Sequence, residues 1–93
     1  MPDQATIERF ADALWMERGL SRNTLSAYQT DLRKLSLWLD KNYGRGLLNA
    51  KREDLLAYLA SQAKSGKKPR SSARLLSCLR QFYQHSLREG WTK

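Results

Sequence analysis

Leucine supplies most of the aliphatic side chains of this chain, and that choice restricts the folds open to it. The 93 residues include sixteen leucines and one isoleucine, and they include no valine. Sheets draw heavily on β-branched residues, whereas leucine is among the best helix formers. The sequence therefore predicts an all-α domain. Because 41% of the residues are hydrophobic, a chain of this length can bury one modest core.

Apolar residues recur with the helical period in four segments, which are separated by glycine and proline. The expected helices cover about residues 4–17, 22–42 and 52–63, followed by a fourth that begins near Ser71 or Ser72 and stops at Gly90. Asp3 and Ser21 are the expected N-caps of the first two helices, and Gly19 is the expected stop of the first. The expected core positions of these two helices are Ile7, Phe10, Ala11, Leu14, Leu25, Tyr28, Leu32, Leu35 and Leu39.

The last third of the chain combines a cationic loop with a strongly two-sided helix. The apolar side is expected to carry Leu76, Leu79, Phe82, Tyr83 and Leu87. The opposite side carries, at helical spacing, Arg70, Arg74, Ser77, Gln81, Gln84 and Arg88. A helix that packs through one side and presents guanidinium groups and short polar donors on the other suits a DNA major groove.

The net charge of the chain is +8, and the positive charge is concentrated in its second half. Residues 1–46 contain seven Lys or Arg and six Asp or Glu, a net charge of +1; residues 47–93 contain ten and three, a net charge of +7. This asymmetry favours a polyanionic partner. The single cysteine, Cys78, excludes an internal disulfide, and we find no membrane-spanning run or signal pattern. We therefore expect a cytoplasmic protein without a membrane partner.

No pattern in the sequence indicates catalysis. There is no phosphate-binding glycine motif, and one cysteine with one histidine cannot form a zinc site. His85 and Arg88 lie one turn apart, but no further group is expected to converge on them. We expect no catalytic residue, no metal site and no cofactor.

A binding surface remains. Lys67, Lys68 and Arg70 are suited to neutralising phosphates, while Arg74 and Gln81 are suited to guanine and adenine edges. Two alternatives stay open: a helical protein-interaction module whose basic face binds an acidic partner, and an RNA-binding bundle. A reader of single-stranded RNA exposes stacking aromatic rings, whereas Tyr28 and Tyr83 fall on expected core faces.

Long segments of the chain resemble the N-terminal core-binding domain of tyrosine recombinases, most closely that of the bacterial Xer subfamily. The resemblance is carried by "ERFADALWMERGLSRNTLSAYQTDLRKLSLWL", "REDLLAYLA" and "SSARLLSCLRQFYQHSLREG", and it covers nearly the whole chain. It implies a four-helix, SAM-like orthogonal bundle that forms one half of a clamp around a recombination half-site. The second and fourth helices would face the major groove.

Carried over by position, the resemblance implies two groups of DNA-binding residues and one protein contact. The second helix would contribute Arg22, Asn23, Thr24, Ser26, Ala27, Thr30 and Arg33. The fourth helix would contribute Arg70, Ser71, Ser72, Arg74, Ser77, Cys78 and Gln81. The first helix would offer Trp15 and Met16 to a neighbouring protomer. For one duplex to touch both helices, Arg33 and Arg74 must face the same side.

The resemblance also implies a larger enzyme. In the family the catalytic tyrosine lies in a separate C-terminal domain, which this chain lacks, so residues 1–93 would form a single DNA-binding domain without activity of its own. The intact enzyme would cleave DNA through a 3′-phosphotyrosyl link without metal or nucleotide cofactor. Its partners would be double-stranded DNA, its own catalytic domain and other recombinase protomers in a tetramer, although the isolated domain would be a monomer. A Xer protein would resolve chromosome dimers at cell division, at the bacterial nucleoid.

Overall fold

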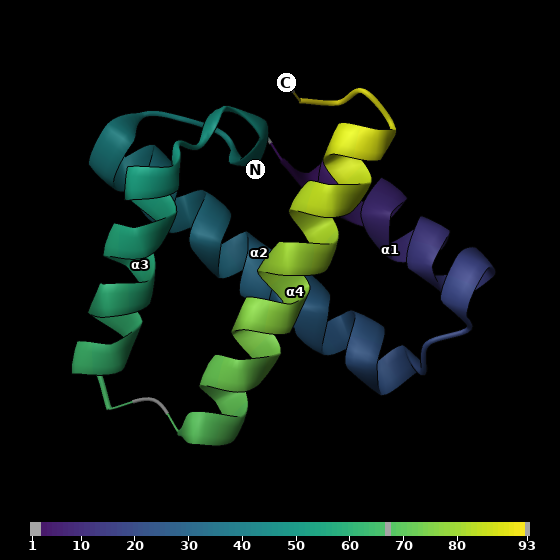
Figure 1. Ribbon diagram of the computed structural model, residues 1–93, viewed down its shortest axis with the longest axis horizontal. Coiled ribbons are helices and arrows are strands. Elements are labelled where there is room, and N and C mark those ends of the chain that lie inside the picture. Colours follow the sequence, from purple (N-terminus) through teal and green to yellow (C-terminus); the bar gives the residue numbers. More distant parts are fainter. Residues whose placement is uncertain (1–2, 67, 93) are drawn as a thin grey trace.

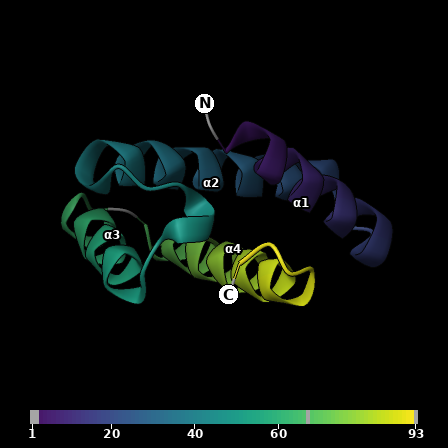
Figure 2. The ribbon, with the colours of Figure 1, turned by 90° about the horizontal axis from the view of Figure 1, so that it is seen from above.

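The protein folds into four α-helices arranged in two layers. The structure, a computed structural model, describes residues 3–66 and 68–92. Its elements are α1 (Gln4–Arg18), α2 (Arg22–Tyr43), the short 3-10 helix η1 (Leu47–Asn49), α3 (Arg52–Lys64) and α4 (Pro69–Arg88). Seen from above, α1 and α2 form one layer and α3 and α4 the other (Figure 2). The described residues contain no strand, so the expected all-α, four-helix bundle is confirmed.

Helix α2 is the centre of the bundle. It packs against both α1 and α4, and α4 crosses in front of it (Figure 1). Its N-cap is Ser21, as predicted, because the Ser21 hydroxyl accepts a hydrogen bond from the Thr24 amide at 3.2 Å. The predicted stop of α1 is also confirmed, since Gly19 adopts a left-handed conformation with φ of 61°.

The fourth helix begins earlier than the sequence suggested. Pro69 was expected to end a helix, with Ser71 or Ser72 as the cap, but Pro69 is the first residue of α4 and Lys68 occupies the N-cap position. Proline fits the first helical position because its missing amide hydrogen would have no helical partner there. Arg70 therefore belongs to the helix and not to the loop.

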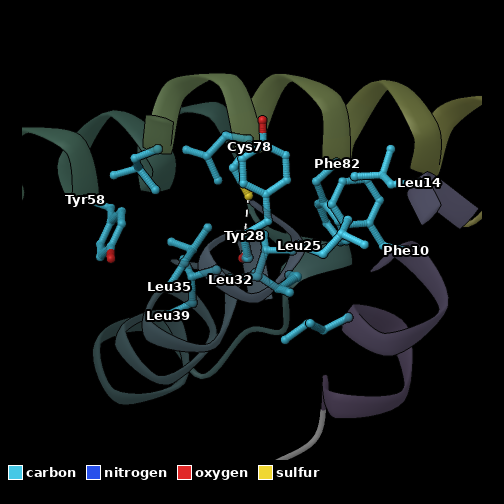
Figure 3. Packing of buried hydrophobic residues seen from close by; sticks show 14 residues of the cluster. Phe10, Leu14, Leu25, Tyr28, Leu32, Leu35, Leu39, Tyr58, Cys78 and Phe82 are labelled. Carbon is cyan, nitrogen blue, oxygen red and sulfur yellow. Dashed lines mark hydrogen bonds between the residues drawn. The ribbon is translucent and has the colours of Figure 1, made fainter. Parts of the chain in front are cut away.

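The core joins all four helices, and the predicted faces of α1 and α2 are confirmed. Phe10 and Leu14 of α1 pack with the α2 face and with α4 (Figure 3), and Ile7 belongs to the same cluster. The rings of Phe10 and Phe82 meet edge to face, with centroids 5.2 Å apart. This geometry is favourable for aromatic pairs and ties α1 to α4.

The predicted core face of α4 is partly wrong. Leu79 and Phe82 are buried as expected, but Leu76 and Leu87 are exposed, with 48% and 56% of their surface accessible. Leu75 and Cys78 are buried in their place. The buried side of α4 is thus turned toward α2, with the small Cys78 side chain where the two helices cross (Figure 3). Leu76 and Leu79 also line an open groove beside α3.

Two acidic side chains fix the connections around the bundle. Asp3 precedes α1 as predicted, but its carboxylate does not cap the helix; it is buried and accepts hydrogen bonds from the Ser36 hydroxyl and the Leu47 amide. The α3 helix begins after Lys51, a residue type that cannot cap. Asp54 compensates, because its carboxylate accepts a hydrogen bond from the Lys51 amide at 3.0 Å.

Candidate nucleic-acid interface

An ion pair lies where α4 crosses α2. Arg74 of α4 donates from Nε and Nη2 to the two carboxylate oxygens of Asp31 in α2, at 3.0 and 2.9 Å. The Asp31 side chain is 1% exposed and that of Arg74 is 41% exposed, so the carboxylate is buried and the guanidinium reaches the surface. The hydrogen bond to Asp31 raises the pKa of Arg74 above its usual value. Arg74 is therefore held in a single orientation at this surface.

One turn further along α4, a polar cluster links the same two helices. The Gln81 amide nitrogen donates to the Tyr28 hydroxyl at 3.0 Å and to Ser77 Oγ at 3.2 Å, and Tyr28 and Ser77 are themselves 3.2 Å apart. The Oε1 atom of Gln81 is buried and has no hydrogen-bond partner among residues 3–66 and 68–92. Ser77 and Gln81 are thus turned toward α2 and are only partly accessible to a ligand.

The first turn of α4 is more open. Lys68 and Arg70 are exposed, and Arg70 lies one helical turn before Arg74 on the same side. Ser71 is near this side, whereas Ser72, two residues before Arg74, is turned about 200° away around the helix. The remaining predicted phosphate contact, Lys67, lies outside the described residues.

On α2, only part of the predicted DNA-binding group adjoins α4. Thr24 and Ala27 precede Asp31 by seven and four residues and therefore share its side of the helix. Asn23 and Ser26 are exposed, and Thr30 is partly exposed, on the outer side of α2. The Thr30 hydroxyl donates to the Ser26 carbonyl at 3.0 Å.

The two arginines predicted on α2 do not join this surface. Arg33 Nε donates to Gln4 of α1 at 3.3 Å, and the Arg22 guanidinium lies 5.9 Å from the centre of the Trp15 ring, also on α1. Arg33 follows Asp31 by two residues, which corresponds to about 200° around a helix. The requirement that Arg33 and Arg74 face the same side is therefore not met, and Arg33 belongs to the α1 side of α2.

Cys78 was predicted to approach DNA, and this prediction is wrong. Its side chain is fully buried, and its thiol lies 3.6 Å from the Tyr28 carbonyl oxygen, to which it donates (Figure 3). Burial raises the pKa of the Cys78 thiol to about 12. The error has the same origin as the error in the core face of α4, since the buried stripe lies about one residue from its expected position.

Sequence reasoning missed the role of Asp31 altogether. A carboxylate in the middle of a helix ordinarily lies on a solvent-exposed face, so no role was predicted for Asp31. One signal was available: Asp31 lies three residues after Tyr28 and one before Leu32, within the apolar stripe of α2. An acidic residue in such a stripe requires a hydrogen-bonding or basic partner.

Trp15 and Met16 lie on α1, away from the α4 crossing. They are 49% and 83% exposed. Two neighbouring exposed apolar side chains of this size are compatible with the predicted protein contact.

His85 and Arg88 meet, but as part of the packing between α1 and α4. The buried His85 ring lies between Phe10 and Trp91, and Arg88 Nη2 is 2.9 Å from its Nδ1 atom. The same Arg88 nitrogen donates to both carboxylate oxygens of Glu17.

Among the described residues, no three His, Cys, Asp or Glu side chains are grouped as a metal ion requires. In the same residues, no helix is long and apolar enough to cross a membrane.

Comparisons with known proteins agree with this architecture. The chain is 49% identical over 86 residues to a protein of Pseudomonas aeruginosa named tyrosine recombinase XerD, an alignment that covers 90% of this chain and 28% of the relative. A protein of the same name from Yersinia pestis is 46% identical, over 94% of this chain and 29% of the relative. Another, from Xanthomonas axonopodis pv. citri, is 47% identical, over 95% of this chain and 28% of the relative.

The chain thus spans less than a third of the length of these relatives. No solved structure matches it. Residues 7–90 match the family described as "Phage integrase, N-terminal SAM-like domain". That match covers nearly all of α1 to α4, and the chain belongs to this family.

Proposed function

We propose that this chain is the DNA-binding domain of a site-specific tyrosine recombinase and that it binds duplex DNA through the surface formed by α2 and α4. The observation that carries the proposal is the exposed guanidinium of Arg74, which Asp31 holds where α4 crosses α2, one helical turn after Arg70. Thr24 and Ala27 of α2 flank this site. Arginine in a fixed orientation is suited to the two acceptors on a guanine edge.

Charge supports the same assignment. The half of the chain that contains α4 has a net charge of +7, and Lys68 and Arg70 are exposed at the start of this helix. Basic side chains and the amide groups of a helix N-terminus both attract phosphate. We assign the phosphate contacts to this end of α4 and the base contacts to the turns that follow.

In the proposed whole enzyme this domain would form half of a clamp, joined to a catalytic domain that supplies the tyrosine nucleophile. The enzyme would act as a tetramer of recombinases on DNA, with Trp15 and Met16 in contact with a neighbouring protomer. The names of the relatives support recombination by a tyrosine recombinase. We extend this to strand exchange at a specific site and to chromosome dimer resolution in the bacterial cytoplasm.

A titration with duplex oligonucleotides at several salt concentrations tests DNA binding. With roughly four phosphate contacts, the logarithm of the binding constant should fall with the logarithm of salt at a slope of about −3.6. Lys68→Ala should weaken binding to all sequences equally and flatten the slope by about one unit. A flat salt dependence for the wild-type chain would refute the proposal.

A second candidate function, a module that binds an acidic protein, is favoured by one observation. A groove of about 310 Å³ separates α3 from α4. It is lined by Leu55, Leu56, Leu59, Leu76, Leu79 and Tyr83, with Arg52 and Arg80 at its edges. If the variant Leu56→Glu still binds DNA, the groove is not needed for DNA binding. The α2–α4 surface would then be the DNA surface, and the groove would be free for another partner.

A further inference from the structure

The buried carboxylate of Asp31 is unexpected beneath a surface that binds DNA, because a negative charge there repels phosphate. Asp31 is 2% exposed, and both of its oxygens accept hydrogen bonds from Arg74. A buried carboxylate requires a partner. The partner here is Arg74, the side chain that the proposed function places against a base.

The geometry leaves one edge of Arg74 available. A guanidinium has five N–H donors in one plane, and Asp31 accepts from the Nε and Nη2 donors on one edge. The neighbouring edge, formed by Nη1 and Nη2, keeps an unused N–H on each nitrogen, and the side chain is 41% exposed. Two nitrogens on one edge are what a guanidinium uses to bind O6 and N7 of guanine.

We propose that Asp31 is a positioning residue that fixes Arg74 for recognition of a base, an inference that rests on the proposed function. A free arginine side chain loses conformational freedom when it binds, and this loss reduces affinity. In this chain the Arg74 side chain loses that freedom when the protein folds, because Asp31 already holds it. The charge of Asp31 also offsets that of Arg74, so the pair adds little attraction for phosphate and contributes sequence discrimination instead.

The decisive variant is Asp31→Asn, which keeps the shape and one acceptor oxygen but removes the charge. A preferred duplex is first selected from a randomised pool with the wild-type 93-residue chain. For Asp31→Asn, the ratio of affinities for the preferred and a scrambled duplex should fall about tenfold, the loss of one bidentate base contact. Affinity for the scrambled duplex should not fall, since the variant gains one net positive charge.

Asp40→Asn is the matched control. Asp40 is exposed on the same helix, and its side chain takes part in none of the ion pairs found among the described residues. The control makes the same change in charge and should keep the full discrimination. Equal discrimination by Asp31→Asn and wild type would overturn the inference, as would an equal loss in both variants.

The orientation of Arg74 can be measured without DNA. In the free wild-type chain, the Arg74 Nε–H order parameter should approach that of rigid backbone, about 0.85, and in Asp31→Asn it should fall below about 0.6. A mobile Arg74 in the wild type would overturn the inference while leaving DNA binding intact. A rigid Arg74 in a chain that binds no duplex would instead refute the proposed function, and the inference with it.

Arg74→Lys decides the matter if Asp31→Asn does not fold. Lysine retains the charge opposite Asp31 but cannot use two edges at once. Discrimination should fall about tenfold while the salt slope stays unchanged. Full discrimination with lysine at this position would overturn the inference.

Discussion

The adjacent residues Leu75 and Leu76 provide a direct test of how α4 is oriented in the bundle. The sequence pattern assigned Leu76 to the core, whereas the structure buries Leu75 to 1% exposure and leaves Leu76 at 48%. Replacing each with alanine removes the same atoms from adjacent positions of one helix. The change in helix propensity is also the same, so the difference between the two variants reports burial alone.

The expected magnitudes follow from these exposures. Truncating a buried leucine to alanine costs about 2–5 kcal/mol, because the transfer free energy of the lost atoms and the cavity left behind add together. Leu75, at 1% exposure within the core cluster, falls in this range. Leu76 has only about half of its side chain covered, so its truncation should cost about 1 kcal/mol or less.

Urea unfolding followed by tryptophan fluorescence and circular dichroism measures both values. With a denaturant slope of about 1.3 kcal/mol/M, a difference of about 2.5 kcal/mol moves the midpoint of Leu75→Ala about 2 M below that of Leu76→Ala. If Leu76→Ala were the more costly, α4 would be rotated by about 100°. Asp31 would then face position 75 and not Arg74, and the proposed DNA surface would have to be abandoned.

Two further predictions concern ionisable groups. Because burial raises the pKa of Cys78 to about 12, the folded chain at pH 8 should react with a disulfide reagent roughly three orders of magnitude more slowly than the chain in urea; its stability should also decline as pH rises above about 9. Comparable rates would show that Cys78 is accessible. The Lys51 amide, and then Arg45, lower the pKa of Asp54, which therefore stabilises the fold above its ordinary pKa and loses this contribution in acid. Wild type should melt at a higher temperature than Asp54→Asn at pH 7, and the gap should close by about pH 2; a gap independent of pH would contradict this account.

The predictions succeeded where a helix has a single apolar stripe. Helices α1 and α2 each bury a single stripe against the same core, so the 3.6-residue period identified Ile7, Phe10, Leu14, Leu25 and the rest of both stripes. The cap at Ser21 and the stop at Gly19 were equally clear, because both depend only on local backbone chemistry.

The predictions failed where α4 has two apolar sides. One side, with Leu75 and Phe82, packs in the core, and the other, with Leu76 and Leu87, is exposed. Hydrophobic periodicity alone does not distinguish a buried stripe from an exposed one. The choice depends on where α3 lies, and the long-range arrangement of helices is not encoded in the period of a single segment.

The same limitation affects the residues of α2 that were assigned to DNA. Seven residues between Arg22 and Arg33 were predicted to bind it, yet Arg33 donates to Gln4 of α1. Removing Arg33 and Arg22 from the surface leaves α2 with small side chains, Thr24 and Ala27, beside α4. Small residues allow a duplex to approach closely, whereas the cations lie on α4 and before it, at Lys68, Arg70 and Arg74. In the proposed complex, α4 would supply the attraction and the base contacts, and α2 would contribute chiefly by supporting Arg74 through Asp31.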